Sequence, residues 1–505
     1  LVGSEMCIRD RYNTFIIKKY ERTINMNSTS RHNNDCTSIL KNITSTWHLE
    51  AKQENEDLFF YIDDVNSIKE GEKCYVIGRK GMGKTAISEY LYNQSSEHIF
   101  SERLSFKNFP FNLLYTLDNS NYTSPNQYIT IWKYLIYNGI CKMMAKNNNL
   151  APELQTALNK VYSSQPIKAL NKLVPKWTAS GFGAEILGCG INVEGISKNI
   201  NNITWTEKTD IFEDIIEQAA DDSYYYILID ELDEDYRDFE DEAQRKTYIY
   251  LLTSLFKAVQ NIRAYFKDST INIRPVVFLR SDIYAFLKDS DKNKWSEYIL
   301  NLAWTPEKLQ EMLCYRLAVS SDGLYSKETV WNQLFPHKFV YMGNRGHNKM
   351  TTFSYITRST HWRPRDYIHY ISQCAKIALQ KGKTNITSPI IKEADKEFSE
   401  YLKGEIVDEI FAVLPDINQI LSTLSQIRKQ TFSPTTFIEE YTSTYSVSEN
   451  DAKMILRQLF EHGVIGNQPS MKGQQIFKHE YPNALFNFNE NMTIHRGLYK
   501  ALQIF

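Results

Sequence analysis

Apolar residues along the chain occur in short continuous runs and in longer stretches with helical spacing. Continuous runs at 74–77, 224–229 and 275–279 are typical of strands buried on both faces, as in a parallel sheet. Weaker strand candidates lie at 103–109 and 298–304. Helical spacing between these runs predicts amphipathic helices that cover the strands. The alternation predicts an α/β fold with a parallel sheet.

Helices dominate the rest of the pattern. The stretch 245–266 places its apolar residues on one face, which we expect to be core. Thr305 and Pro306 can begin a helical region that extends to about residue 400, with Thr305 as N-cap. Helices after Ser433 and at 451–462 then precede strand-like pieces at 475–479 and 485–489, the order of a winged-helix domain.

These patterns divide the chain into four expected parts. They are an unstructured segment 1–45, a P-loop-type core 46–304, a helical lid 305–400 and a winged-helix-like domain 401–505. Residues 1–11 resemble translated sequencing-adapter sequence and are set aside. The stretch 171–200 is expected to be a hairpin or flexible insertion, because glycines punctuate its short apolar pairs. Its Gly-x-Gly pieces do not join a strand to a helix, so they are not taken as a second nucleotide-binding motif.

A glycine-rich motif at 78–85 fits G-x-x-x-x-G-K-[S/T], between an apolar run and a helical stretch. Its glycines let backbone N–H groups turn toward a polyanion, and the following helix adds its positive end. Lys84 can bridge the β- and γ-phosphates of ATP, and Thr85 can hold Mg²⁺. This setting favours nucleotide binding over a turn without a ligand. The expected binding residues are Gly78, Arg79, Lys80, Gly81, Met82, Gly83, Lys84 and Thr85.

Two carboxylates follow the apolar run 224–229. Asp230 is expected to hold Mg²⁺, directly or through water, and Glu231 to orient and deprotonate the attacking water. The alternative is a strand followed by an acidic loop, since Asp233 and Asp235 continue the charge. The glycine motif upstream favours the catalytic interpretation.

Two arginines are candidates for sensing the γ-phosphate. Arg280 follows the run 275–279, at the strand edge where ligands of open α/β sheets gather. Arg365 stands at the start of a predicted lid helix, with Arg363 as the alternative. A solvated arginine at 280 and an arginine paired with Asp366 or a neighbour at 365 remain equally good interpretations.

Composition restricts the classes of partner. The net charge of −2 gives no global signal for nucleic acid or acidic membranes, and no apolar run is long enough to cross a bilayer. Seven scattered cysteines without a C-x-x-C pair fit a reducing cytoplasm. From residue 401 onward nine basic and eleven acidic residues give a net charge of −2, low for a domain that binds mainly phosphates.

The ordered motifs resemble AAA-type ATPases of the origin-recognition kind. The chain looks more narrowly like a bacterial group of P-loop ATPases sharing the motifs at 78–85, 229–233, 278–283 and 363–366. The resemblance implies an ATP-binding α/β core, a helical lid, a C-terminal winged helix and the roles named above. An arginine at position 280, where many AAA proteins have Asn or Thr, is more like signalling ATPases of the STAND and KAP kinds.

The expected function is therefore Mg²⁺-dependent ATP binding and slow hydrolysis that drive a conformational switch in a bacterial, cytoplasmic protein. The alternatives are a DNA-binding initiator or remodeller, and a nucleotide-sensing scaffold of bacterial defence that does not hydrolyse ATP. The C-terminal domain would dock DNA or protein, no membrane partner is expected, and nucleotide could drive homo-oligomer formation. GTP is disfavoured because Asn171-Lys172-Leu173-Val174 lacks the Asp of a guanine-reading motif.

Overall fold

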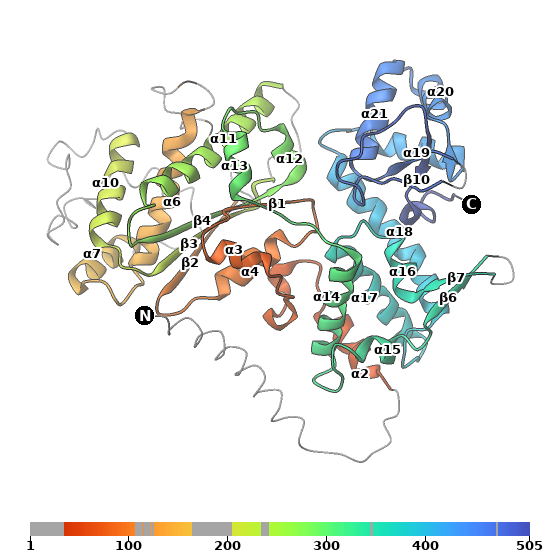
Figure 1. The fold of residues 1–505 in the computed structure, drawn as a ribbon, viewed down its shortest axis with the longest axis horizontal. Helices are drawn as coiled ribbons and strands as arrows, with labels where there is room; N and C mark the ends of the chain where they lie inside the picture. The colour runs from red at the N-terminus through yellow and green to blue at the C-terminus, as the bar shows by residue number, and fades with distance from the viewer. Residues whose placement is uncertain are drawn as a thin grey trace, which may run out of the picture. The chain divides into compact units, whose positions relative to one another are not determined.

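The computed structural model describes residues 35–106, 115, 123, 126–163, 205–233, 242–343, 347–470 and 473–504 (Figure 1). The chain forms two compact units. We call Tyr61–Ala303 the sheet unit, and Trp304–Phe505 together with the residues before Tyr61 the helical unit. The expected adapter-like residues 1–11 and the glycine-rich stretch 171–200 lie outside the described residues.

The sheet unit is built on five parallel strands in the order β2-β3-β4-β1-β5. This confirms the predicted parallel α/β sheet. The second strand begins and ends earlier than expected, since Ser105 is its last residue. The strands are β1 Tyr75–Gly78, β2 Ile99–Ser105, β3 Tyr224–Asp230, β4 Asn272–Arg280 and β5 Ile299–Asn301.

Helices cover both faces of this sheet, with α4 on one face and α6 and α11 on the other (Figure 1). The predicted apolar face of 245–266 is buried in α11, as expected. Helix α6 approaches β3 closely at Gly139, where a Cβ atom would lie 2.7 Å from Ile227 Cδ1. The helices are α3 Asp64–Lys69, α4 Lys84–Asn93, η3 Asn126–Tyr128, α6 Ile129–Met144, α7 Pro152–Ser163, α10 Trp205–Ala219, α11 Glu242–Tyr265, α12 Ser281–Phe286, α13 Lys292–Trp295 and η6 Ser296–Tyr298.

The helical unit begins with a helix that the sequence did not predict. Helix α2, Thr37–Thr46, lies in the segment expected to be unstructured up to residue 45, and it packs against α17. Its Ile39, Leu40 and Ile43 are completely buried. The sequence prediction missed this helix because its apolar face is short and lies among many polar residues. The segment 46–60, expected in the core part, also belongs to this unit.

The middle of the helical unit is a bundle. Thr305 caps α14 by accepting a hydrogen bond from the Lys308 N–H, and Pro306 is the first helical residue, as predicted. Helix α18 continues through residue 400, where a domain boundary was expected. The elements are η1 Ala51–Gln53, η2 Glu56–Leu58, α14 Pro306–Ser320, α15 Val330–Leu334, β6 Phe339–Met342, β7 Asn348–Thr351, α16 Thr352–Thr357, α17 Pro364–Gln380 and α18 Ser388–Ile410.

The last part of the helical unit combines three helices with an antiparallel sheet of order β8-β10-β9. The strands are not at the expected 475–479 and 485–489. Strand β9 contains Asn467 and Gln468, polar residues of low strand propensity whose buried side chains bond to Asn487 and Thr431. The elements are α19 Ile417–Ile427, β8 Thr431–Phe432, α20 Pro434–Tyr445, α21 Glu449–Glu461, β9 Ile465–Gln468, β10 Asn491–Ile494 and η8 Arg496–Leu498.

The lengths and hydropathy of the helices can be compared with those of membrane-spanning helices. Within the part of the chain that the structure describes, every helix is too short or too polar to serve as a membrane span.

Candidate nucleotide site

The glycine motif forms the turn between β1 and α4, as predicted. Strand β1 ends at Gly78 and α4 begins at Lys84. Gly81 and Gly83 have φ angles of +82° and +99°, which only glycine adopts without strain. A Cβ atom on Gly83 would meet nothing within 4 Å, so packing does not explain the glycine. The conformation of the backbone accounts for the glycine, and the space beside Gly83 is open.

Lys84 turns back into this loop. Its Nζ donates hydrogen bonds to the carbonyl oxygens of Gly78, at 2.9 Å, and Arg79, at 3.1 Å. Burial lowers the pKa of the ammonium group, against the attraction of Asp233 and Asp230. Thr85 follows in the first turn of α4. An ammonium group that donates to two carbonyl oxygens can exchange them for a phosphate.

Asp230 ends strand β3 at the same edge of the sheet. Its Oδ1 accepts a hydrogen bond from the Glu231 N–H at 2.8 Å, while Oδ2 is buried and has no hydrogen-bond partner among the described residues. Burial raises the pKa of Asp230 to about 6, and Lys84 acts in the opposite direction. A buried carboxylate oxygen of this kind fits a hard cation such as Mg²⁺, or water bound to it.

Glu231 has an unusual backbone conformation, with φ at +62°. Non-glycine residues rarely adopt this conformation, which stores strain and is common at functional sites. The Ser105 hydroxyl at the end of β2 donates a hydrogen bond to Glu231 Oε2. Parallel pairing sets Ser105 opposite Asp230, which explains this contact. The sequence prediction missed Ser105 because it placed that residue inside a strand rather than at its end.

Arg280 ends strand β4, directly opposite Gly78 in the pairing with β1. It is 8 % exposed, so it is not the solvated arginine that was one of the two interpretations. Its Nε and Nη2 donate hydrogen bonds to Asp282 at 3.1 and 2.6 Å, and Nη1 lies 3.6 Å from Asp233 Oδ2. The fold therefore brings Lys84, Asp230 and Arg280 together at one edge of the sheet.

The two arginines of the helical unit differ from each other. Arg363 is completely buried and forms ion pairs with Asp366, at 2.9 Å, and Glu409, at 3.1 Å. Such an enclosed arginine stabilises the start of α17 and is a poor candidate for a sensor. Arg365 is partly exposed, and its Nη1 lies 3.5 Å from Glu405 Oε2. Its role as a sensor stays a prediction.

Comparisons with known proteins give a family for one segment. The profile of a family described as "FunZ-associated C-terminal helical domain" matches residues 307–407, which extend from α14 into α18. No curated protein matches the sequence. The family match covers part of the helical unit only.

Among solved structures, the chain is similar to origin-recognition proteins. Cdc6p from Pyrobaculum aerophilum is 12% identical, with a TM-score of 0.32 over 86% of this chain and 89% of that one. Aeropyrum pernix ORC2, in ADPNP and ADP complexes, is 12% identical, with a TM-score of 0.39 over 87% and 90%. Aeropyrum pernix ORC1, in complex with DNA, is 11% identical, with a TM-score of 0.37 over 94% and 98%.

Proposed function

We propose that this chain binds Mg²⁺–ATP, hydrolyses it slowly and uses the change at the γ-phosphate as a conformational switch. One observation carries the proposal: a glycine loop with open space beside Gly83 lies at the sheet edge where Lys84, Asp230 and Arg280 meet. Asp230 and Arg280 are buried, and burying a charged group is costly unless it has a partner. A bound polyanion and its cation give the three groups a common partner.

Each residue has a distinct part in this mechanism. The backbone N–H groups of 78–85 and the end of α4 bind the phosphates, and Lys84 moves from its carbonyl partners to the β- and γ-phosphates. Thr85 and Asp230 would hold Mg²⁺, which neutralises phosphate charge when bound. Glu231, which the Ser105 hydroxyl positions through a hydrogen bond, orients and deprotonates the attacking water.

The switch rests on competition for arginines. Arg280 pairs with Asp282 and Asp233, carboxylates that a γ-phosphate would replace. Loss of the γ-phosphate would return Arg280 to these aspartates. Arg365, whose bond to Glu405 is long, stays a prediction as the second sensor. The distance that the equilibrium moves depends on how much more tightly each nucleotide binds one conformation than the other.

Two variants test the site, measured by equilibrium nucleotide binding and phosphate release. Lys84→Ala should lose binding of ATP and ADP, because the phosphates lose their principal cation. Glu231→Gln should keep ATP affinity while turnover falls about 10²- to 10⁴-fold, the usual contribution of a general base. Lys267→Ala, an exposed lysine of the same unit, is the control and should behave as wild type.

Three results would count against the proposal. Unchanged turnover in Glu231→Gln would show that the base is elsewhere. Nucleotide binding without turnover in the wild type would favour the non-hydrolysing defence scaffold. ATP binding that survives in Lys84→Ala would remove the basis for the site itself. Sedimentation with ATP and with ADP would show whether nucleotide drives homo-oligomer formation.

DNA binding is the second candidate, supported by the element order α19, β8, α20, α21, β9, β10, which suits a winged helix. Outward residues of α21 include Lys453, paired with Glu449, and Arg457, whose guanidinium lies 5.3 Å from the Phe488 ring centre. Salt-dependent duplex binding that is lost in Lys453→Glu/Arg457→Glu would support it. Equal duplex binding by wild type and variant would contradict it and leave protein docking.

A further inference from the structure

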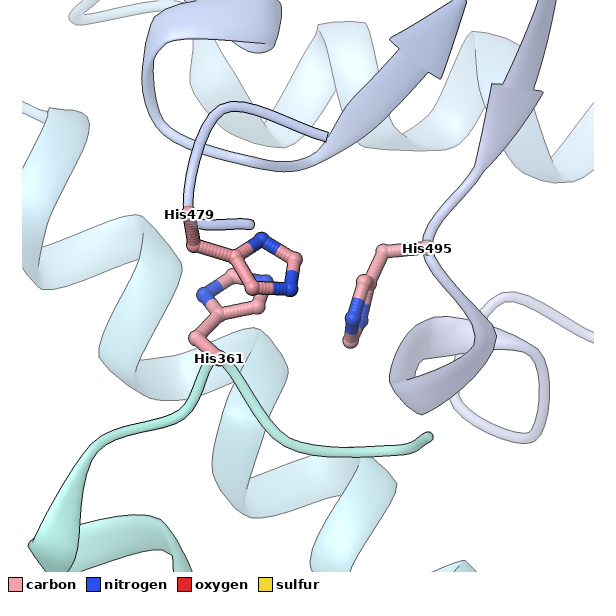
Figure 2. A group of neighbouring side chains, drawn as sticks. All are labelled: His361, His479 and His495. Atoms are coloured by element: carbon pink, nitrogen blue, oxygen red, sulfur yellow. The ribbon is translucent and has the colours of Figure 1, made fainter. Parts of the chain in front are cut away.

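Three histidines from distant parts of the chain meet inside the helical unit. His361 lies between α16 and α17, His479 between β9 and β10, and His495 directly after β10. Figure 2 shows the three rings gathered around a common space. The ring centroids are 4.9 Å apart for His361 and His479, 4.5 Å for His361 and His495, and 5.1 Å for His479 and His495.

This histidine cluster is buried in an aromatic setting. His361 and His495 are 2 % and 3 % exposed, and the His479 side chain is 3 % exposed. The Phe477 ring lies 5.5 Å from the His479 ring and 5.1 Å from the His495 ring. Burying a polar imidazole costs more than burying a phenyl or aliphatic group of similar size. Three together indicate a chemical role rather than the filling of space.

We propose that His361, His479 and His495 bind a divalent transition-metal ion, zinc above all, which fastens the last sheet of the chain to the loop before α17. Neutral imidazole nitrogens are preferred ligands of Zn²⁺. One ring nitrogen of each histidine lies within 4.8 Å of one nitrogen of both others. Two nitrogens on a tetrahedral zinc, each 2.0–2.1 Å from it, are about 3.3 Å apart. For the three nitrogens to bind one zinc ion, each nitrogen–nitrogen distance must therefore shorten by about 1.5 Å or less. Rotation of the side chains can supply a change of this size.

The surroundings of the cluster suit such a site. Glu480 Oε1 lies 3.9 Å from His479 Nε2, where a carboxylate can orient the imidazole or supply a fourth ligand. Gly463, with φ at +72°, leaves room beside the rings: a Cβ atom there would lie 3.2 Å from His479 Nδ1 and 3.5 Å from His361 Nε2. His495 Nδ1 accepts the Gly497 N–H at 3.2 Å, a long hydrogen bond that ligation by this nitrogen would replace.

The role of the metal would be to hold the fold together. The loop with His361 belongs to the segment of the FunZ-associated family, while His479 and His495 lie well beyond its end. A metal that binds these residues in the folded chain and not in the unfolded one stabilises their packing by mass action. The proposal is independent of the nucleotide site, which lies in the sheet unit.

Metal content tests the proposal directly. Full-length protein without an affinity tag, purified without chelators or nucleotide and incubated with zinc sulfate, should retain about one zinc per chain after desalting, measured by mass spectrometry. His361→Gln and His495→Gln should each retain less than a fifth of that amount. His48→Gln, an exposed histidine of the same unit, should retain all of it.

A second measurement needs no variant, so misfolding of the variants cannot obscure the result. Cobalt added to metal-depleted wild type should produce visible absorption bands typical of nitrogen ligation, and zinc should abolish them. Added zinc should also raise the thermal midpoint of wild type. The proposal is overturned if wild type takes up neither metal, or if both cluster variants retain as much zinc as His48→Gln.

Discussion

Two buried arginines directly precede helices, Arg280 before α12 and Arg363 before α17, and their surroundings differ in a way that separates a structural role from a functional one. Arg363 pairs with side chains of Asp366 and Glu409 that are 0 % and 4 % exposed. Arg280 pairs with Asp282 and Asp233, which are 21 % and 38 % exposed, and lies opposite the first glycine of the open loop. The first arginine has partners that it cannot exchange. The second has partners that a phosphate could displace, which makes it the better candidate for a sensor.

The largest expected effect sharpens this comparison from the structural side. Arg363→Met should lower the free energy of unfolding by about 3–5 kcal/mol, because Asp366 and Glu409 would remain buried without their cation. Urea denaturation followed by tryptophan fluorescence measures it. A loss below about 1 kcal/mol would show that water reaches these carboxylates and that the enclosed pair is not structural.

Arg280→Met should have a small effect on stability and a large effect on ATP turnover, the reverse of what Arg363→Met is expected to do to stability. Its exposed partners can be hydrated after the change, so the free energy of unfolding should fall by only about 1 kcal/mol. Turnover of ATP should fall about 10²-fold, the usual effect of removing one group that stabilises charge in the transition state. The measurement pairs urea denaturation with phosphate release. A large fall in the free energy of unfolding with normal turnover would instead show that Arg280 has a structural role, as Arg363 does.

Ser105→Ala tests the contact that positions Glu231. Loss of one hydrogen bond to a carboxylate, worth about 1.5 kcal/mol, should lower turnover about tenfold. ATP affinity should not change, since Ser105 touches the acid and not the loop. Ser105→Thr keeps the hydroxyl and should restore turnover. An equal fall in both variants would mean that the site tolerates no change of volume here.

The smallest expected effect concerns pH. Burial raises the pKa of Asp230 to about 6, above its ordinary value near 3.8. The folded protein therefore holds this proton more tightly than the unfolded chain, and its stability without ligand should decline as pH rises from about 4 to 6. Mg²⁺ requires the ionised form, so Mg²⁺-dependent affinity for ATP should rise over the same range. Asp230→Asn should weaken both trends relative to wild type, as measured by thermal unfolding and nucleotide titration.

Local motifs explain why much of the sheet unit could be predicted. The loop at 78–85 and the pair Asp230 and Glu231 are contiguous, and each is joined to an apolar run that marks a strand. The residue types of each motif therefore indicate its chemistry, and the adjoining apolar run indicates where the strand ends. Arg280 was found by the same rule, although its burial and its bonds to Asp282 could not be foreseen.

Contacts between distant segments account for what was missed. Ser105 meets Glu231 only through the pairing of β2 with β3, which depends on strand ends that the sequence left uncertain. Strand β9 has polar residues whose partners lie in other loops. The histidine cluster joins three positions with no common spacing, and its members become visible as a group only when α17 and β10 are folded.

Helix α2 has a consequence for biosynthesis. Its apolar face is translated before the sheet unit, yet its partner α17 is translated after it. Because domains generally fold as they leave the ribosome, N-terminal parts first, α2 must wait while the five strands assemble. The nascent chain would then expose Ile39, Leu40 and Ile43 throughout that interval, although the folded protein buries all three side chains completely.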